Sequence, residues 1–301
     1  MTTESHVKDL EEEISDLESR LENARTRLAR VSASPPISDT STSPLPVEVF
    51  PSPSHALLLL SDSALPLGSF AYSSGLESYI AHNKPLPRSI TPVASFHRFL
   101  RLSLASMGRL SLPYVLAGYR KPQDLETLDN DLDASTPCPV AQRASIAQGR
   151  ALIGVWERAF KGTYASGSAH FLKASEQEGS RAVEEFSEAL KGSMDDELGP
   201  KGHFAPLWGV VCLAMGVDAL QTAYVFMLNH AKAVLSAAVR ASVMGPYQAQ
   251  NILASKNLQN MIAERVELDW NTAVEDAGQV VPPLDLWVGR HELLYSRIFN
   301  S

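Results

Sequence analysis

The sequence predicts an all-α protein, and three observations carry this prediction. Apolar side chains recur at helical spacing from residue 55 onward, for example at Phe96, Phe99 and Leu104. No stretch shows the alternation of apolar and polar residues that is typical of a half-buried strand. The strongly apolar stretch 204–217, which lacks a charged residue or histidine, is shorter than the ~20 residues of a membrane helix and indicates a core helix. We therefore expect a compact helical bundle around this central helix.

The first 54 residues contain two patterns of their own. Apolar residues at heptad positions a and d over residues 1–32 predict an amphipathic helix. Its flanking charges favour an antiparallel or heteromeric coiled coil over a parallel homodimer, with a solitary solvated helix as the alternative. Residues 33–54 are rich in proline and serine, which indicates a disordered linker. The heptad residues are Val7, Leu10, Ile14, Leu17, Leu21, Ala24, Leu28 and Val31.

The helical domain is expected to span residues 55–301. Two of its stretches, 120–136 and 162–202, are polar and contain glycine or acidic residues. We expect both to be surface insertions.

Helix boundaries inside this domain follow from capping and stop signals. Ser74 and Glu77 have the spacing of a capping box, which places a helix start near Ser74. A five-turn apolar stripe covers residues 220–238, and Gly245 followed by Pro246 is expected to stop it.

Composition limits the classes of partner and compartment. The formal net charge of −8 and the pI near 5.5 argue against a nucleic-acid partner, which needs clustered basic residues. Cys138 and Cys212 form neither a disulfide framework nor a metal-ligand spacing, as in a reducing compartment. The acidic beginning of the chain lacks the apolar core of a secretory signal, and no stretch is long enough to span a membrane. We therefore expect a cytoplasmic protein.

Three local patterns resemble catalytic or metal-binding sites in part. The stretch around Ser73 is one substitution from a G-x-S-x-G nucleophile elbow, but no strand leads into it. Asp129, Asp131 and Asp133 begin like a calcium loop without its turn glycine or its bidentate glutamate, and predict a solvated acidic loop. The histidines show no paired ligand spacing, so we expect no permanent metal site. No glycine-rich phosphate loop is present. These patterns favour a non-catalytic protein.

Several blocks of residues 55–301 together resemble one family. Residues 63–77 run S-A-L-P-L-G-S-F-A-Y-S-S-G-L-E, and residues 291–301 run H-E-L-L-Y-S-R-I-F-N-S. The blocks between them contain Q-G-R-A, H-F-A-P-L-W-G and A-A-V-R followed by M-G and a glutamine. All resemble motifs of the UreF family of urease accessory proteins, in a eukaryotic type with an added amino-terminal coiled-coil segment. Val243, Pro246 and Asn300 depart from the family pattern.

The resemblance implies roles for individual residues. It makes Tyr72, Glu77 and Arg240 candidates for contact with, and coupling to, a GTPase partner. It makes the carboxy-terminal stretch a candidate for docking a second partner, through His291, Glu292, Tyr295, Ser296, Arg297 and Phe299. Residues expected to belong to the structural signature are Pro66, Gly68, Ser73, Gly75, Gly149, His203, Pro206, Gly245 and Gln250.

The function that the resemblance implies is a non-catalytic chaperone and adaptor. It would bridge a UreD-type protein, also called UreH, and a UreG-type GTPase, couple or gate GTP hydrolysis, and assist nickel insertion into urease apoprotein. The family also implies a homodimer, no cofactor, and at most a transient passage of nickel. Two alternatives are a coiled-coil scaffold that works through residues 1–54 and a helical serine hydrolase that uses Ser73.

Overall fold

The computed structural model describes residues 18, 53–165, 173–193 and 199–300. The chain divides into two compact units, residues 1–48 and residues 49–301, and the helices described below belong to the second unit. The predicted heptad helix and most of the linker lie outside the described residues. The final linker residues, Pro53 and Ser54, already belong to the first described helix of the second unit.

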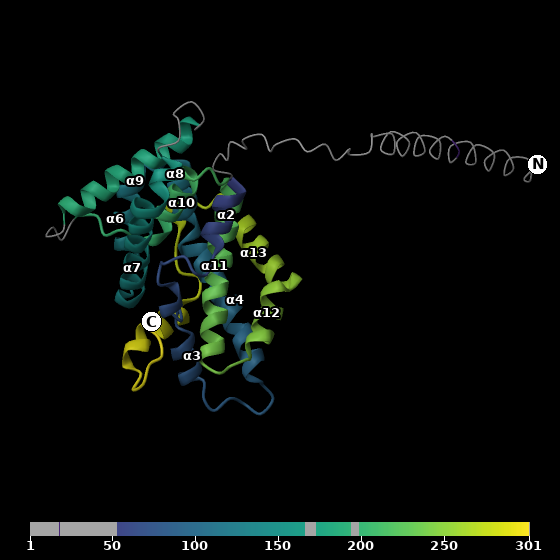
Figure 1. The fold of residues 1–301 in the computed structure, drawn as a ribbon. Helices are drawn as coiled ribbons and strands as arrows, with labels where there is room; N and C mark the ends of the chain where they lie inside the picture. The colour runs from purple at the N-terminus through teal and green to yellow at the C-terminus, as the bar shows by residue number, and fades with distance from the viewer. Residues whose placement is uncertain (1–17, 19–52, 166–172, 194–198, 301) are drawn as a thin grey trace, which may run out of the picture. The chain divides into compact units, whose positions relative to one another are not determined.

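The second unit is helical throughout its described part, where no strand occurs, and the all-α prediction is confirmed (Figure 1). Its helices are α2 (Pro53–Ser61), α3 (Leu76–His82), α4 (Pro92–Leu110), α5 (Leu112–Arg120), α6 (Leu125–Ser135), α7 (Pro139–Val155), α8 (Lys161–Tyr164), α9 (Ala174–Gly192), α10 (Phe204–Ala214), α11 (Ala219–Arg240), α12 (Pro246–Ala254), α13 (Lys256–Asp269) and α14 (Pro282–Arg290). Short 3₁₀ turns are η1 (Ser69–Ala71), η2 (Pro122–Asp124), η4 (Val274–Asp276) and η5 (His291–Leu293), and η3 (Trp156–Phe160) is a π turn.

The predicted central helix is α10, and every residue from Ala205 to Ala214 is buried. It packs against α5, α7 and α9. Glycines make these close approaches fit: a methyl group at Gly209 would clash with the carbonyl oxygen of Val115, and one at Gly149 would clash with the carbonyl oxygen of Gly202. The backbones of α5 and α10 are therefore in direct contact, and so are the backbone of α7 and that of the residues just before α10.

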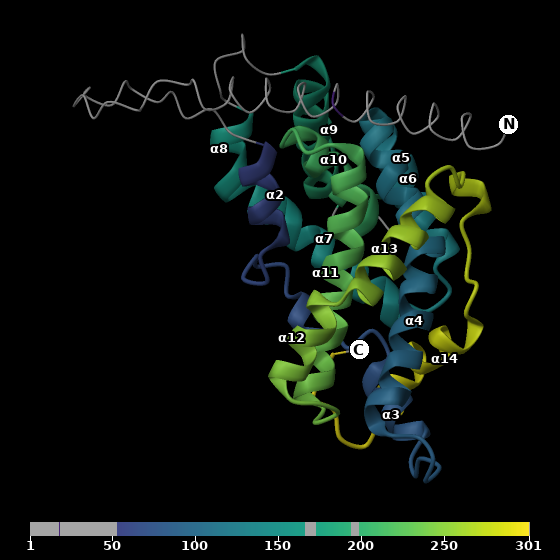
Figure 2. The same ribbon diagram turned by 90° about the vertical axis from the view of Figure 1, so that its right-hand side faces the viewer.

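The longest of the described helices, α11, begins where Asp218 caps it and accepts the backbone N–H of Gln221 at 2.8 Å. It packs against α2, α4 and α13, and α12 follows it after a short turn (Figure 2). The predicted stop is confirmed, because α11 ends at Arg240 and Pro246 opens α12 with Gly245 as its N-cap. Proline suits this first helical position because it has no N–H to leave unpaired.

The two polar stretches expected to be surface insertions instead contribute to the core. In residues 120–136, α6 buries Leu125, Leu128 and Leu132. In residues 162–202, α9 lies against α10 and buries Val183 and Phe186. Both helices are amphipathic. Because most of their residues are polar and face outward, the narrow apolar stripe of each helix is hard to recognise in the sequence. Among the described helices, none combines the length and apolar character needed to cross a lipid bilayer.

Candidate functional site

The turn before α3 sets the geometry of the site. Gly68 and Gly75 both have left-handed backbone angles, with φ of 70° and 85°, and so does Ser74, with φ of 52°. The helix consequently begins at Leu76, and the hydroxyl of Ser73 accepts the backbone N–H of Glu77 at 3.3 Å. The predicted capping box of Ser74 and Glu77 is therefore wrong. The side chain of Glu77 is left free to reach another part of the chain.

That other part is the carboxy-terminal segment, residues 291–300. The carboxylate of Glu77 accepts the backbone N–H of Ile298 at 2.8 Å and that of Phe299 at 3.2 Å. The ring nitrogen Nε2 of His291 lies 2.8 Å from the same carboxylate, and a carboxylate can only accept, so His291 donates. Three donors thus converge on one charged acceptor, and bonds of this kind are about twice as strong as neutral ones.

Arg240, at the end of α11, holds the other side of the segment. Its guanidinium lies 4.3 Å from the centre of the Phe299 ring and donates a hydrogen bond to the carbonyl oxygen of Phe70. The backbone N–H of Asn300 donates to the carbonyl oxygen of Ala71 at 2.8 Å. Because Asn300 is bound through its backbone, its departure from the family pattern leaves this contact intact.

The segment is buried at both ends and exposed between them. His291 has no exposed surface and Phe299 is 4% exposed. Leu293, Tyr295 and Ile298 are 79%, 107% and 60% exposed. An exposed apolar group of this size on a held backbone is typical of a surface that binds another protein. We call residues 291–300 with Glu77 and Arg240 the tail clasp.

The clasp joins two sets of residues that the family resemblance assigns to different partners. Glu77 and Arg240, candidates for the GTPase, contact His291 and Phe299, candidates for the second partner. The other candidates in the tail, Ser296 and Arg297, are exposed, and so is Glu292, which forms an ion pair with Arg143 of α7.

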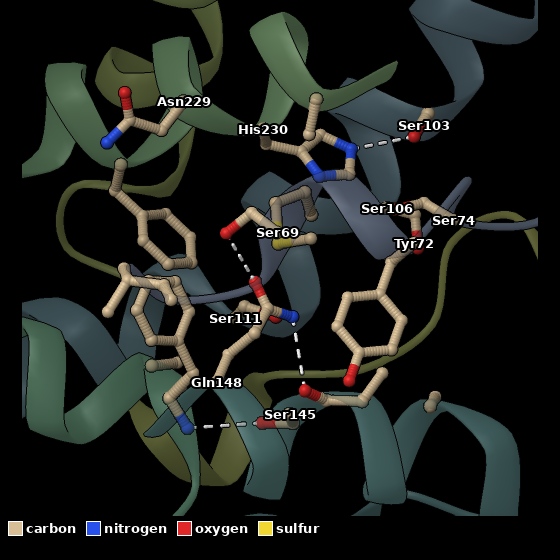
Figure 3. A pocket seen from close by; sticks show the side chains of 18 of the residues that line it. Ser69, Tyr72, Ser74, Ser103, Ser106, Ser111, Ser145, Gln148, Asn229 and His230 are labelled. Carbon is tan, nitrogen blue, oxygen red and sulfur yellow. Dashed lines mark hydrogen bonds between the residues drawn. The ribbon is translucent and has the colours of Figure 1, made fainter. Parts of the chain in front are cut away.

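Tyr72 does not join this cluster. Its side chain is half-buried and points into a cavity that it lines together with Ser69 and Gln148 (Figure 3). Burial raises the pKa of its phenol. The expectation that Tyr72 acts next to Glu77 and Arg240 is not supported by the position of its side chain.

The remaining signature residues are structural. His203 is fully buried, with its Nδ1 3.1 Å from the hydroxyl of Ser145 and its Nε2 3.0 Å from a carboxylate oxygen of Asp133. Pro206 lies in α10, where its carbonyl oxygen leaves no space for a side chain at Gly118 of α5. Gly75 lets the turn approach α14 closely, because a methyl group there would press on Val288.

Three other signature residues lie on the surface. Pro66 is exposed in the turn before Gly68, while Gly245 and Gln250 are exposed at the start of α12. None of the three forms a hydrogen bond with the tail clasp among the described residues.

A buried acidic group was missed by the sequence reasoning. Asp129, expected in a solvated acidic loop, lies in α6 and has no exposed surface. Its carboxylate accepts the backbone N–H of Lys201 at 2.6 Å, that of Gly202 at 3.1 Å and that of His203. These groups precede α10, so Asp129 fixes the entry to the central helix. The helical spacing of Leu125, Leu128 and Leu132 was the signal that could have revealed it.

The reactive-serine alternative is not supported. Ser73 is completely buried, its hydroxyl serves as an acceptor for α3, and no strand leads into it in the described part of the chain. Within the described residues there is also no group of three or more His, Cys, Asp or Glu side chains arranged to hold a metal ion.

The fold and the clasp thus define a helical protein that holds a peptide segment with exposed apolar side chains on its surface, the class of a protein-binding accessory. A family model described as UreF matches residues 90–256. A UreF-like urease accessory protein of Schizosaccharomyces pombe is 36% identical over 247 residues, which cover 82% of this chain and 97% of the relative. The chain belongs to the UreF family.

Relatives from plants and bacteria agree with this membership. Urease accessory protein F of Arabidopsis thaliana is 32% identical over 251 residues, covering 80% of this chain and 90% of the relative. Urease accessory protein UreF of Actinobacillus pleuropneumoniae is 26% identical over 252 residues, covering 82% of this chain and 98% of the relative. The protein therefore has an accessory role in urease maturation and is not an enzyme.

Proposed function

We propose that this protein is an adaptor that bridges a UreD-type protein and a UreG-type GTPase during urease maturation. It couples or gates GTP hydrolysis and so assists the insertion of nickel into urease apoprotein. Nickel is the cargo of this assembly, and its contact with this chain is at most transient. The chain acts in the cytoplasm, without a cofactor of its own, and pairs as a homodimer.

The tail clasp is the observation that supports this proposal. Leu293, Tyr295 and Ile298 offer an apolar surface to the UreD-type partner, while their backbone is held by Glu77 and Arg240. A partner that binds the tail therefore changes the contacts of the Glu77 carboxylate and the Arg240 guanidinium, and these two groups are also the candidates for contact with the GTPase. Coupling between two partners requires a shared element whose conformational equilibrium both partners can shift. In this proposal the clasp is that element.

The experiment is copurification of the tagged full chain with coexpressed UreD-type and UreG-type proteins on a sizing column. Tyr295→Ala removes the most exposed tail residue and leaves the clasp bonds intact. Tyr247→Ala, on α12, removes another tyrosine that is 90% exposed and serves as the matched control. We expect Tyr295→Ala to weaken the UreD-type contact at least tenfold and Tyr247→Ala to leave it unchanged. If the wild-type chain elutes alone although both partners are soluble, the adaptor proposal is wrong.

Coupling needs a second readout. Glu77→Gln keeps the size of the side chain but removes its charge, and it should change the GTP hydrolysis rate of the assembled complex. Glu185→Gln, which alters only an exposed ion pair with Arg181 on α9, should not. A hydrolysis rate that is equal in the wild type and Glu77→Gln complexes would contradict a coupling role for the clasp.

The competing scaffold hypothesis places function in residues 1–54. Deleting these residues spares complex formation if the tail clasp is the docking element and abolishes it if the heptad segment is. A fluorophosphonate probe tests the hydrolase alternative, which requires Ser73 to be labelled.

A further inference from the structure

A cavity of about 290 Å³ lies between α4, α7, α11 and the turn before α3 (Figure 3). It is distinct from the exposed face of the tail clasp. Its mouth is marked by Asp62, Ser63 and Phe70, which line it and are exposed at the surface. A volume of this size is near the lower end of the range for small-molecule sites.

The wall of the cavity is rich in uncharged polar groups. The hydroxyls of Tyr72, Ser74, Ser111 and Ser236 make no hydrogen bond to another described residue. His230 has its Nε2 2.7 Å from the hydroxyl of Ser103, while its second ring nitrogen points into the cavity (Figure 3). These donors and acceptors converge on one enclosed space, as specific ligand sites require.

The charged groups of the wall are already bound within the chain. Asp62 accepts the backbone N–H of Ala64 at 2.9 Å, and Lys232 donates to the carbonyl oxygen of Ser61. Asp285 accepts a hydrogen bond from the amide of Gln279 at 2.8 Å. Among the described residues, the wall thus carries carboxylates and an ammonium together, so an anion or a cation placed there would also lie near a like charge.

The environment itself disfavours charge. Burial lowers the pKa of His230 to about 4 and lowers the pKa of Lys232. Burial also raises the pKa values of Asp285 and Tyr72. All four shifts favour the uncharged form of the group, which is what desolvation does. An ion entering this cavity would lose hydration, while Lys232 and Asp285 are themselves shifted towards their uncharged forms.

Apolar side chains complete the wall. Leu67, Met107 and Phe226 line the same space as the free hydroxyls. We propose that this cavity is a binding site for a small uncharged molecule that combines an apolar ring or chain with an amide or hydroxyl group. The ligand would hydrogen-bond to the free ring nitrogen of His230 and to the wall hydroxyls, and its apolar part would pack on these side chains.

The test uses three probes of nearly the same shape: benzamide, which is neutral, benzoate, an anion, and benzamidine, a cation at neutral pH. Binding to the full-length chain is measured by ligand-observed NMR titration and by calorimetry. We expect benzamide to bind in the millimolar range or tighter and each charged probe to bind at least tenfold more weakly. Equal binding of the three probes, or no binding of benzamide, would overturn the proposal.

A cavity-filling variant locates the probe. Ala233 lines the cavity on α11, so Ala233→Leu should weaken benzamide binding at least tenfold. Ala254→Leu makes the same change at an exposed position at the end of α12 and should leave binding unchanged. Binding that persists in Ala233→Leu would place benzamide elsewhere and contradict the site. If Ala233→Leu fails to fold, the comparison of the three probes on the wild-type chain still decides.

Discussion

Glu77 and His291 are 214 residues apart in the sequence, and their side chains meet at 2.8 Å in the folded chain. Both are largely withdrawn from solvent, since the side chain of Glu77 is 12% exposed and that of His291 has no exposed surface. The contact closes the last segment of the chain onto the first helix after the signature turn. It explains why two sets of residues expected to serve different partners occur in one cluster.

Loss of the Glu77 carboxylate should release the tail. In Glu77→Gln, the two backbone N–H groups of Ile298 and Phe299 lose a charged acceptor, and such bonds contribute about 1.5–3 kcal/mol each. We expect amide hydrogen exchange of residues 294–300 to accelerate at least tenfold while α10 exchanges as in the wild type. Unchanged exchange of the tail in this variant would show that the carboxylate does not hold it.

The close approach of α7 to the chain before α10 makes a sharp packing prediction. Gly149→Ala forces a methyl group against the backbone of Gly202 and His203, and we expect a loss of about 3 kcal/mol in the free energy of unfolding. Gly154→Ala, on the same helix, meets only the end of the Arg158 side chain at 3.8 Å and should stabilise the helix by up to ~1 kcal/mol. Urea denaturation of both variants measures the difference. Equal unfolding free energies would contradict the observed packing.

The carboxylate of Asp129 should be essential for stability. Asp129→Asn replaces an acceptor of three backbone N–H groups with an amide that also carries donors, and we expect a loss of about 2–4 kcal/mol. Asp131→Asn, two residues along and exposed, should change stability by less than ~0.5 kcal/mol. The measurement is the midpoint of thermal unfolding. A similar shift in both variants would indicate that only net charge matters.

His230 should make stability depend on pH between 6.5 and 4. Its pKa in the folded chain is lowered to about 4 by burial, so the unfolded chain binds a proton in this window and the folded chain does not. Stability from this group is therefore complete above pH 6.5 and is lost as pH falls towards 4, by up to about 3 kcal/mol. The difference in pH dependence between the wild type and His230→Gln isolates this contribution. Parallel curves for the two proteins would show that His230 does not titrate as expected.

The fold class, the central helix and the stop before α12 could be predicted because each follows from a local pattern. The 14-residue stretch without charge and the apolar stripe of α11 are readable in any window that contains them. The pairing of Glu77 with His291 could not be predicted, because no local pattern encodes a contact across 214 residues. The error at Ser74 arose because a left-handed turn moved the helix start to Leu76.

The polar stretches show a different limit. In α6 the acidic residues are as numerous as the apolar ones, and overall polarity concealed that Asp129 points inward. A buried carboxylate becomes recognisable only when its donors are known, and these come from Lys201 to His203, more than 70 residues away. The contribution of α9 to the core was not predicted for a related reason, since only a narrow face of this helix is buried.

The long span of the tail clasp has a consequence for synthesis on the ribosome. Chains emerge from the amino terminus, so Glu77 and the turn before α3 leave the exit tunnel long before residues 291–300 exist. Until then Glu77 lacks the three donors that hold it in the finished domain. The nascent domain therefore carries an incomplete docking surface, and partners that need the held tail can join only after residues 291–300 have been made.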